Sequence, residues 1–168
     1  ILGKLNSPNG SVFLVNPAGI VFGSTAQVNV GGLVASTLGI SDADFNTGVT
    51  NGHYVFGPGA AHVENGGTIT ASANGTVALL GSQATNDGTI TAPQGTIALG
   101  AGSQITLDIG GDGLTQLTIN VGANGGNGVS VTNSATGKLV ADGGQVLMQA
   151  VKLGPGSFAS VVNSGLVQ

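Results

Sequence analysis

The sequence lacks cysteine, tryptophan and arginine, and only 6% of its 168 residues are charged, against about 25% in an average soluble domain. Without cysteine, the chain has no disulfide framework, no thiolate metal site and no cysteine nucleophile. Its basic residues are three scattered lysines (Lys4, Lys138 and Lys152), and its net charge is -4. This balance excludes the basic surface that nucleic-acid binding and polybasic membrane anchoring require.

Long apolar runs are also missing, although no charged residue occurs between Lys4 and Asp42. Glycine and proline interrupt that stretch, and Gln27 and Asn29 alternate with apolar residues in the period of a β-strand. We therefore expect no membrane insertion. The chain begins without an initiator methionine or the charged start of a signal peptide, so we expect it to be a piece of a longer protein.

Glycine is in excess, with 32 residues, and the glycines accompany an internal repeat. Segment 65–71 recurs at 86–92, and segment 75–79 recurs at 95–99. A repeat of about 20 residues with two short strands in each copy indicates a solenoid. Looser copies of the two motifs lie at 10–14, 133–141, 144–148 and 163–167.

The repeats alternate aliphatic with small or hydroxylated residues, which is the pattern of short strands, and asparagine and glycine mark the corners between them. No segment favours a helix, which each glycine opposes by about 1 kcal/mol. We predict an all-β fold, a right-handed parallel β-helix with about 20 residues per coil, whose hand follows the usual crossover rule. Period two places the following side chains on one inward face: Ile69, Ala71, Val77 and Leu79.

Two segments interrupt the repeat, so we treat residues 1–168 as a single β-helix segment with insertions at 41–57 and 103–132. In the second insertion, two strand-like runs flank a glycine-rich turn, which is typical of a β-hairpin. We expect this extra-helical hairpin to project from the coils. A flexible loop at 122–128 would then return the chain to the β-helix.

Two groups of residues have the composition of a catalytic or metal site, but each has a simpler structural interpretation. Asp42 and Asp44, two apart on a strand, would share a face as glycosidase carboxylates do, yet a solvated turn accounts for them. His53 and His62 have only Glu64 nearby, so a zinc site would need a further ligand from elsewhere. We predict no catalytic residue, no metal site and no cofactor.

Glycine- and asparagine-rich segments produce three further partial motif matches. A calcium-binding nonapeptide is partly matched by Gly110-Gly111-Asp112-Gly113, which lies near Asp108. Threonine stands where that motif requires aspartate. A plain turn is therefore the simpler interpretation. The loop at 122–128 lacks the lysine of a phosphate-binding loop. Asn9-Gly10-Ser11 and Asn74-Gly75-Thr76 match the glycosylation sequon, which arises often by chance in such sequences.

The segments 11–23 (SVFLVNPAGIVFG) and 26–38 (AQVNVGGLVASTL) resemble the two-partner secretion (TPS) domain, the N-terminal haemagglutination-activity domain of filamentous-haemagglutinin-type adhesins and haemolysins. The resemblance continues through Ile40, Asp44-Phe45 and Tyr54-x-Phe56, and the repeats and hairpin fit it. The family's Asn-Pro-Asn-Gly motif falls on Asn16-Pro17-Ala18-Gly19, with alanine at its third position. The family's upstream Asn-Pro-Asn-Leu motif and N-terminal cap have no counterpart, so the resemblance implies truncation at the N-terminus.

The functional motif that the resemblance singles out consists of Asn16, Pro17, Ala18 and Gly19. Proline presets the dihedral angle of a turn, and the asparagine side chain can accept a hydrogen bond from the backbone two residues on. We expect the motif to act mainly as a structural corner. Its place in the family's secretion motif implies that it also matters for export.

The resemblance implies a non-enzymatic module that directs export of a large surface exoprotein from a Gram-negative cell, through the periplasm. Its partner would be an outer-membrane β-barrel transporter whose periplasmic domains recognise the chain while it is unfolded or extended, and edge-strand addition is a plausible mode of contact. Folding of the β-helix outside the cell would help drive transport. Other partners would be downstream repeats of the same polypeptide and a host or bacterial surface receptor, as expected of a virulence-associated adhesin.

Two alternatives remain open at the level of the sequence. A carbohydrate-active or carbohydrate-binding β-helix would carry acids and aromatics on one face of successive coils, and no such period occurs. A passive structural β-solenoid shaft would have no role in secretion, although solenoid surfaces often bind extended ligands.

Overall fold

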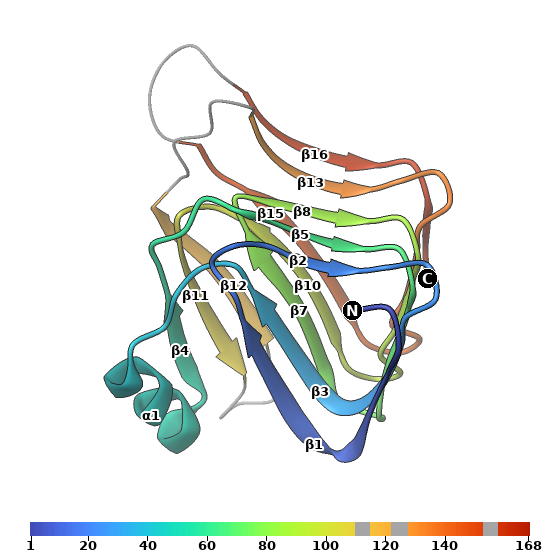
Figure 1. Cartoon of the computed structure of the whole chain (residues 1–168), viewed down its shortest axis with the longest axis horizontal. Coiled ribbons are helices and arrows are strands. Elements are labelled where there is room, and N and C mark those ends of the chain that lie inside the picture. Colours follow the sequence, from blue (N-terminus) through green and yellow to red (C-terminus); the bar gives the residue numbers. More distant parts are fainter. Residues whose placement is uncertain (110–114, 122–127, 153–157) are drawn as a thin grey trace.

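The structure, a computed structural model, describes residues 1–109, 115–121, 128–152 and 158–168. The chain winds into a parallel β-helix in which strands of successive coils lie side by side (Figure 1). The strands of the coils are β1 (Lys4–Val15), β2 (Ile20–Phe22), β3 (Gln27–Ser36), β5 (His62–Asn65), β6 (Thr68–Ala71), β7 (Thr76–Gly81), β8 (Gln83–Asn86), β9 (Thr89–Thr91), β10 (Thr96–Ala101), β13 (Val129–Asn133), β14 (Lys138–Val140), β15 (Gln145–Ala150), β16 (Ala159–Asn163) and β17 (Leu166–Val167).

The coils form two sheets, and every strand pairing in them is parallel. One sheet has the order β16-β13-β8-β5-β2. The other bends within β3, which pairs with β6 up to Val30 and with β7 from Leu33 onward. The predicted parallel β-helix is therefore confirmed, and β7 and β10 pair in the register of the repeat, with Val77 opposite Ile97.

Aliphatic side chains from successive coils stack in register to form the core. Val28, Ile69, Ile90 and Leu139 form one such row, and all four side chains are buried. The four residues predicted to face inward lie in the same cluster. Each large aliphatic side chain buried in this way contributes about 1.5–3 kcal/mol, and the neighbouring coils exclude water from it.

A ladder of asparagines runs through the interior along the ends of β5, β8, β13 and β16. The Nδ2 atoms of Asn65, Asn86 and Asn133 each donate to the Oδ1 of the asparagine in the next coil, at 2.8 Å, with Asn163 as the last acceptor. The first three side chains are fully buried. Because a buried amide is costly unless it is hydrogen-bonded, the ladder fixes the register of the coils as well as stabilising them.

Two excursions from the β-helix come together on its outer surface. The first contains α1 (Asp42–Asn51) and β4 (His53–Phe56), and the second contains β11 (Gln104–Ile109) and β12 (Thr115–Val121). The predicted hairpin is found, since β11 and β12 pair antiparallel. Strand β11 also pairs antiparallel with β4, which makes a three-stranded sheet.

The expectation that the hairpin projects from the coils is wrong. Its inner face packs on the outer face of β3, β7 and β10 (Figure 1), where Ile105 and Leu107 join Leu80 in a second buried cluster. The outer face of these coil strands is itself apolar, so covering it removes more hydrophobic surface from water. The last residues of the second predicted insertion, from Val129, lie in the coil strand β13.

The helix α1 contradicts the expectation that no segment favours a helix. Ser41 caps its N-terminus, where its Oγ accepts a hydrogen bond from the Asp44 N–H at 3.1 Å, and Gly52 ends it by donating its N–H to the Gly48 carbonyl at 2.7 Å. Acidic residues in the first turn also stabilise the helix, because they interact favourably with the positive end of its dipole. These end signals and the packing of Gly48 against Tyr54 prevail over the poor helix propensity of the sequence between them.

Candidate functional site

The Asn16-Pro17-Ala18-Gly19 motif forms the exposed turn between β1 and β2. The Gly19 N–H donates to the Asn16 carbonyl at 3.1 Å, which closes the turn. The Asn16 side chain bridges it, because its Oδ1 accepts from the Ala18 N–H at 3.1 Å and its Nδ2 donates to the Gly19 carbonyl at 3.0 Å. The hydrogen bond expected two residues beyond Asn16 is thus present.

Two further features fix this corner. The Asn16 N–H donates to the Ser36 carbonyl at 3.0 Å, which ties the turn to the end of β3. Gly19 has a φ of 120°, a conformation that L side chains rarely adopt, so glycine is required at the fourth position of the turn. Ala18 contributes only its backbone N–H, so alanine there leaves the bonds of Asn16 intact.

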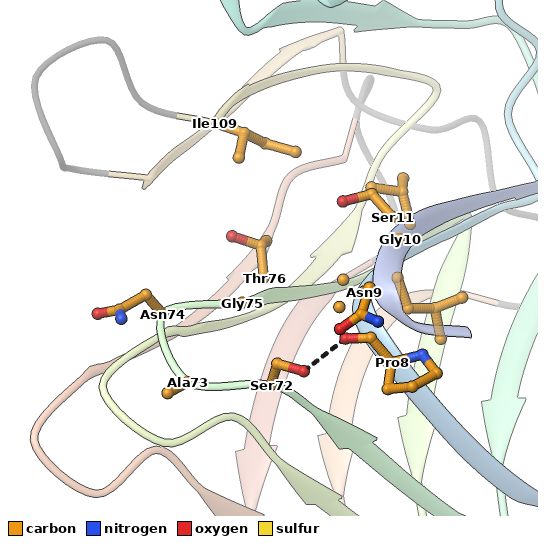
Figure 2. A pocket seen from close by; sticks show the side chains of 14 residues that line it. Pro8, Asn9, Gly10, Ser11, Ser72, Ala73, Asn74, Gly75, Thr76 and Ile109 are labelled. Carbon is orange, nitrogen blue, oxygen red and sulfur yellow. Dashed lines mark hydrogen bonds between the residues drawn. The ribbon is translucent and has the colours of Figure 1, made fainter. Parts of the chain in front are cut away.

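A groove of about 370 Å³ lies at another corner of the β-helix, between β1 and the turn that precedes β7 (Figure 2). The Ser72 Oγ donates to the Pro8 carbonyl at 2.8 Å across its floor, and Ile109 borders it. Both sequon asparagines, Asn9 and Asn74, line it. None of the described lining residues is charged, so the groove offers no acid–base pair.

The structure contradicts the placement of Asp42 and Asp44 on one strand face. Both lie in the first turn of α1, and residues two apart on a helix do not face each other. The Ser41 Oγ donates to the Asp44 Oδ2 at 2.6 Å, so this carboxylate serves the helix cap. The two carboxylates are therefore not placed as a glycosidase pair.

The two histidines lie on different elements, His53 on β4 and His62 on β5. The His53 Nδ1 lies 3.5 Å from the Asp108 Oδ2 on the neighbouring strand β11, and each side chain is a little less than half exposed. Within the described ranges, no group of three or more metal-ligating side chains comes together. Gly110-Gly111-Asp112-Gly113 and most of the loop at 122–128 lie outside the described residues.

An aromatic cluster beneath α1 was not predicted from the sequence. The ring centroids of Phe13 and Tyr54 are 4.8 Å apart, and those of Phe13 and Phe45 are 5.3 Å apart. Burial raises the pKa of the Tyr54 phenol above its ordinary value. Three aromatics within 41–57 were the only signal in the sequence, and their contact with β1 depends on the tertiary fold.

In the part of the chain that the structure describes, no helix has the length and apolar character needed to cross a membrane.

Comparison with known proteins agrees with this architecture. The family model described as the TPS secretion domain matches residues 1–163. Among solved structures, the HMW1 secretion domain from Haemophilus influenzae superposes with a TM-score of 0.56 and 27% sequence identity, over 95% of this chain and 45% of that chain. This chain therefore spans less than half the length of that domain. No curated protein matches the sequence.

The family match covers nearly the whole chain, and the similar structure is itself a secretion domain. The similar structure supports the parallel β-helix seen in this chain. The chain belongs to the TPS secretion domain family, and it is a secretion-directing module of an exoprotein that is exported by the two-partner pathway.

Proposed function

We propose that this module acts by binding and folding, without catalysis, and that its partner is an outer-membrane β-barrel transporter with periplasmic recognition domains. The match of the TPS family model to residues 1–163 carries this proposal. The strands of the coils support a contact through backbone hydrogen bonds, because an extended partner segment can add as a further strand to a sheet.

In this proposal, the transporter receives the chain in an extended state, and the β-helix folds after it emerges. The fold suits such an order, because each coil pairs with the preceding one and can add to it as the chain advances. The exported protein then acts at the bacterial surface. Further repeats of the same polypeptide and a host or bacterial receptor complete its set of partners.

We assign to Asn16, Pro17, Ala18 and Gly19 the role of holding one corner of the coil stack. The bonds of Asn16 to Ala18, Gly19 and Ser36 support this role, since they join β1, β2 and β3 at one point. Loss of this corner would delay formation of the coil that contains it and thereby lower the yield of export.

The test compares Asn16→Ala with Asn46→Ala in the full-length exoprotein, with its transporter present. Asn46 is exposed on α1, and no hydrogen bond joins its side chain to a described residue. We expect Asn16→Ala to cost roughly 0.5–1.5 kcal/mol of stability in the purified domain and to reduce the amount secreted, whereas Asn46→Ala changes neither. Unchanged stability together with unchanged secretion would remove Asn16 from the mechanism.

A further inference from the structure

The last coil of the β-helix exposes apolar side chains at positions that are buried in the preceding coils. Val161 aligns with Val131 of the coil before it, and Val167 aligns with Leu139. Val131 and Leu139 are fully buried, whereas Val161 is 49% exposed and Val167 is 42% exposed. The apolar core is therefore open to water at this end of the coil stack.

The strands β16 and β17 of this coil each lie at the end of their sheet among the described strands, and Figure 1 shows β16 at the edge of the stack. A strand in that position presents backbone N–H and C=O groups to an added strand. We use the name end surface for the outer edges of β16 and β17 together with the side chains of Val161, Asn163 and Val167.

The asparagine ladder reaches the end surface with a defined direction. In each step, the Nδ2 atom of one coil donates to the Oδ1 atom of the next coil. Asn163 thus uses its Oδ1 to accept from Asn133, and no hydrogen bond joins its Nδ2 to any residue that the structure describes. A strand that continues the ladder must therefore supply an acceptor oxygen.

The opposite end of the ladder is closed. Phe22 of β2 aligns with Asn65, the first asparagine of the ladder, and the Phe22 side chain is fully buried. The Asn65 Oδ1 accepts from the Gly67 N–H of its own coil at 3.2 Å, so it needs no donor from the coil that contains Phe22. New steps of the ladder can therefore be added beyond Asn163 but not before Asn65.

The strands that carry the ladder share a residue pattern. An aliphatic residue stands two positions before each ladder asparagine and faces the core with it: Val63, Ala84, Val131 and Val161. A further strand with the same pattern would place its aliphatic side chain on Val161 and its amide on Asn163. The end surface thus matches one type of strand in both packing and hydrogen bonding.

We propose that the end surface is a docking site for a parallel strand that carries asparagine at the position aligned with Asn163. The occupant is a coil from the further repeats of the same polypeptide, so this inference rests on the proposed function, which counts those repeats among the partners. The Oδ1 of the incoming asparagine accepts from the Asn163 Nδ2. An aliphatic residue there would bury this amide without an acceptor, and aspartate would bring a charge into the core, both of which are unfavourable.

A second copy of the chain fits the end surface less well. Its own end surface presents the same amide donor of Asn163, whose Oδ1 already accepts from Asn133. Its opposite end carries Phe22 at the ladder position. Neither end therefore offers the asparagine acceptor that the end surface lacks.

The test joins a copy of residues 71–91 directly after Gln168 in the 168-residue chain. This segment contains β7, β8 and β9 without an excursion. It places its asparagine 21 residues after Asn163, which is the spacing from Asn65 to Asn86 in the chain itself. The added coil therefore continues the stack in register.

Two matched tails accompany the unchanged one. The first carries Asn86→Leu within the copy, which keeps the size of the side chain and removes the acceptor. The second carries Thr85→Ala within the copy, at a position that alternates with the inward-facing residues of the strand. Hydrogen exchange is measured by mass spectrometry on fragments that cover β16, with β7 of the chain as an interior reference.

We expect the asparagine tail to slow exchange in β16 at least about tenfold more than the leucine tail does, because an added hydrogen bond must open first. The Thr85→Ala tail should act like the unchanged tail, and exchange in β7 of the chain should not change. With Asn163→Ala in the chain, the advantage of the asparagine tail over the leucine tail should disappear.

Equal protection of β16 by the asparagine and leucine tails would refute the proposal, because apolar burial alone would then explain docking. The proposal is also wrong if the asparagine tail gives β16 no protection. Protection of β16 that grows with protein concentration in the chain without a tail would show that a second copy occupies the end surface, which contradicts the proposal too. The assay contains no transporter, so its result and the result of the secretion test are independent of each other.

Discussion

Replacing Asn86 by alanine tests whether the asparagine ladder holds the coils together. The Asn86 Nδ2 donates to the Asn133 Oδ1 at 2.8 Å and to the Gly88 carbonyl at 3.1 Å, and its Oδ1 accepts from the Asn65 Nδ2 at 2.8 Å. A lost bond whose partner finds another partner or water costs about 0.5–1.5 kcal/mol, whereas one that leaves a buried partner unpaired costs about 1–3 kcal/mol. Because Asn65 keeps a second acceptor, the Gly67 carbonyl, we expect a total loss of about 3–5 kcal/mol.

The matched control is Asn163→Ala at the exposed end of the same ladder. Asn163 accepts one bond, from the Asn133 Nδ2 at 2.8 Å, and its side chain is exposed to water. We expect this variant to lose only about 0.5–1.5 kcal/mol. Urea unfolding followed by circular dichroism measures both values. If the two variants differ from each other by less than about 1 kcal/mol, the ladder does not carry the stability that its geometry indicates.

Two further predictions concern the elements outside the coils. Gly48→Ala should destabilise the domain by about 1–3 kcal/mol through overpacking, because the new Cβ would overlap the Tyr54 ring. This effect should exceed the higher helix propensity of alanine. A urea midpoint of unfolding no lower than that of Asn46→Ala would refute this prediction. Tyr54 is the only tyrosine, and burial raises its pKa, so the folded chain holds the phenolic proton more tightly than the unfolded chain does. Stability should therefore be unaffected below pH about 10 and fall as the pH rises through the folded-state pKa of Tyr54. The absorbance of tyrosinate follows this titration directly. A titration midpoint in the folded chain at or below that of the urea-unfolded chain would contradict the assignment.

The repeat made the coils predictable from the sequence. Aliphatic residues at fixed positions, such as Ile69 and Ile90, occur in every copy because neighbouring coils bury them in register. The asparagines of the first motif also recur at fixed positions, but asparagine is common in turns, and we interpreted them as corner residues. The structure places Asn65 and Asn86 at the inner ends of strands. Recurrence at the same position of successive copies was the signal that distinguishes a ladder from a turn.

The excursions were harder to predict because they depend on long-range pairing. Strand β4 meets β11 across about 50 residues of chain, and no local pattern in either segment specifies that partner. The helix α1 did have local signals, since Ser41 and Asp44 form a cap and Gly52 follows the last turn. Because we interpreted the two aspartates as residues of a strand, these helix-end signals were missed. The turn at Asn16 was predictable because proline and asparagine encode it locally.

Export of the natural exoprotein with and without residues 1–163 tests the central claim most directly. Cells that produce the exoprotein and its outer-membrane transporter would be compared for the amount of extracellular exoprotein, with the leader and all other segments unchanged. A module that directs two-partner secretion predicts that the deletion abolishes extracellular exoprotein, and that removing the transporter has the same effect on the intact chain. Export that continues without residues 1–163, or that does not need the transporter, would contradict the account.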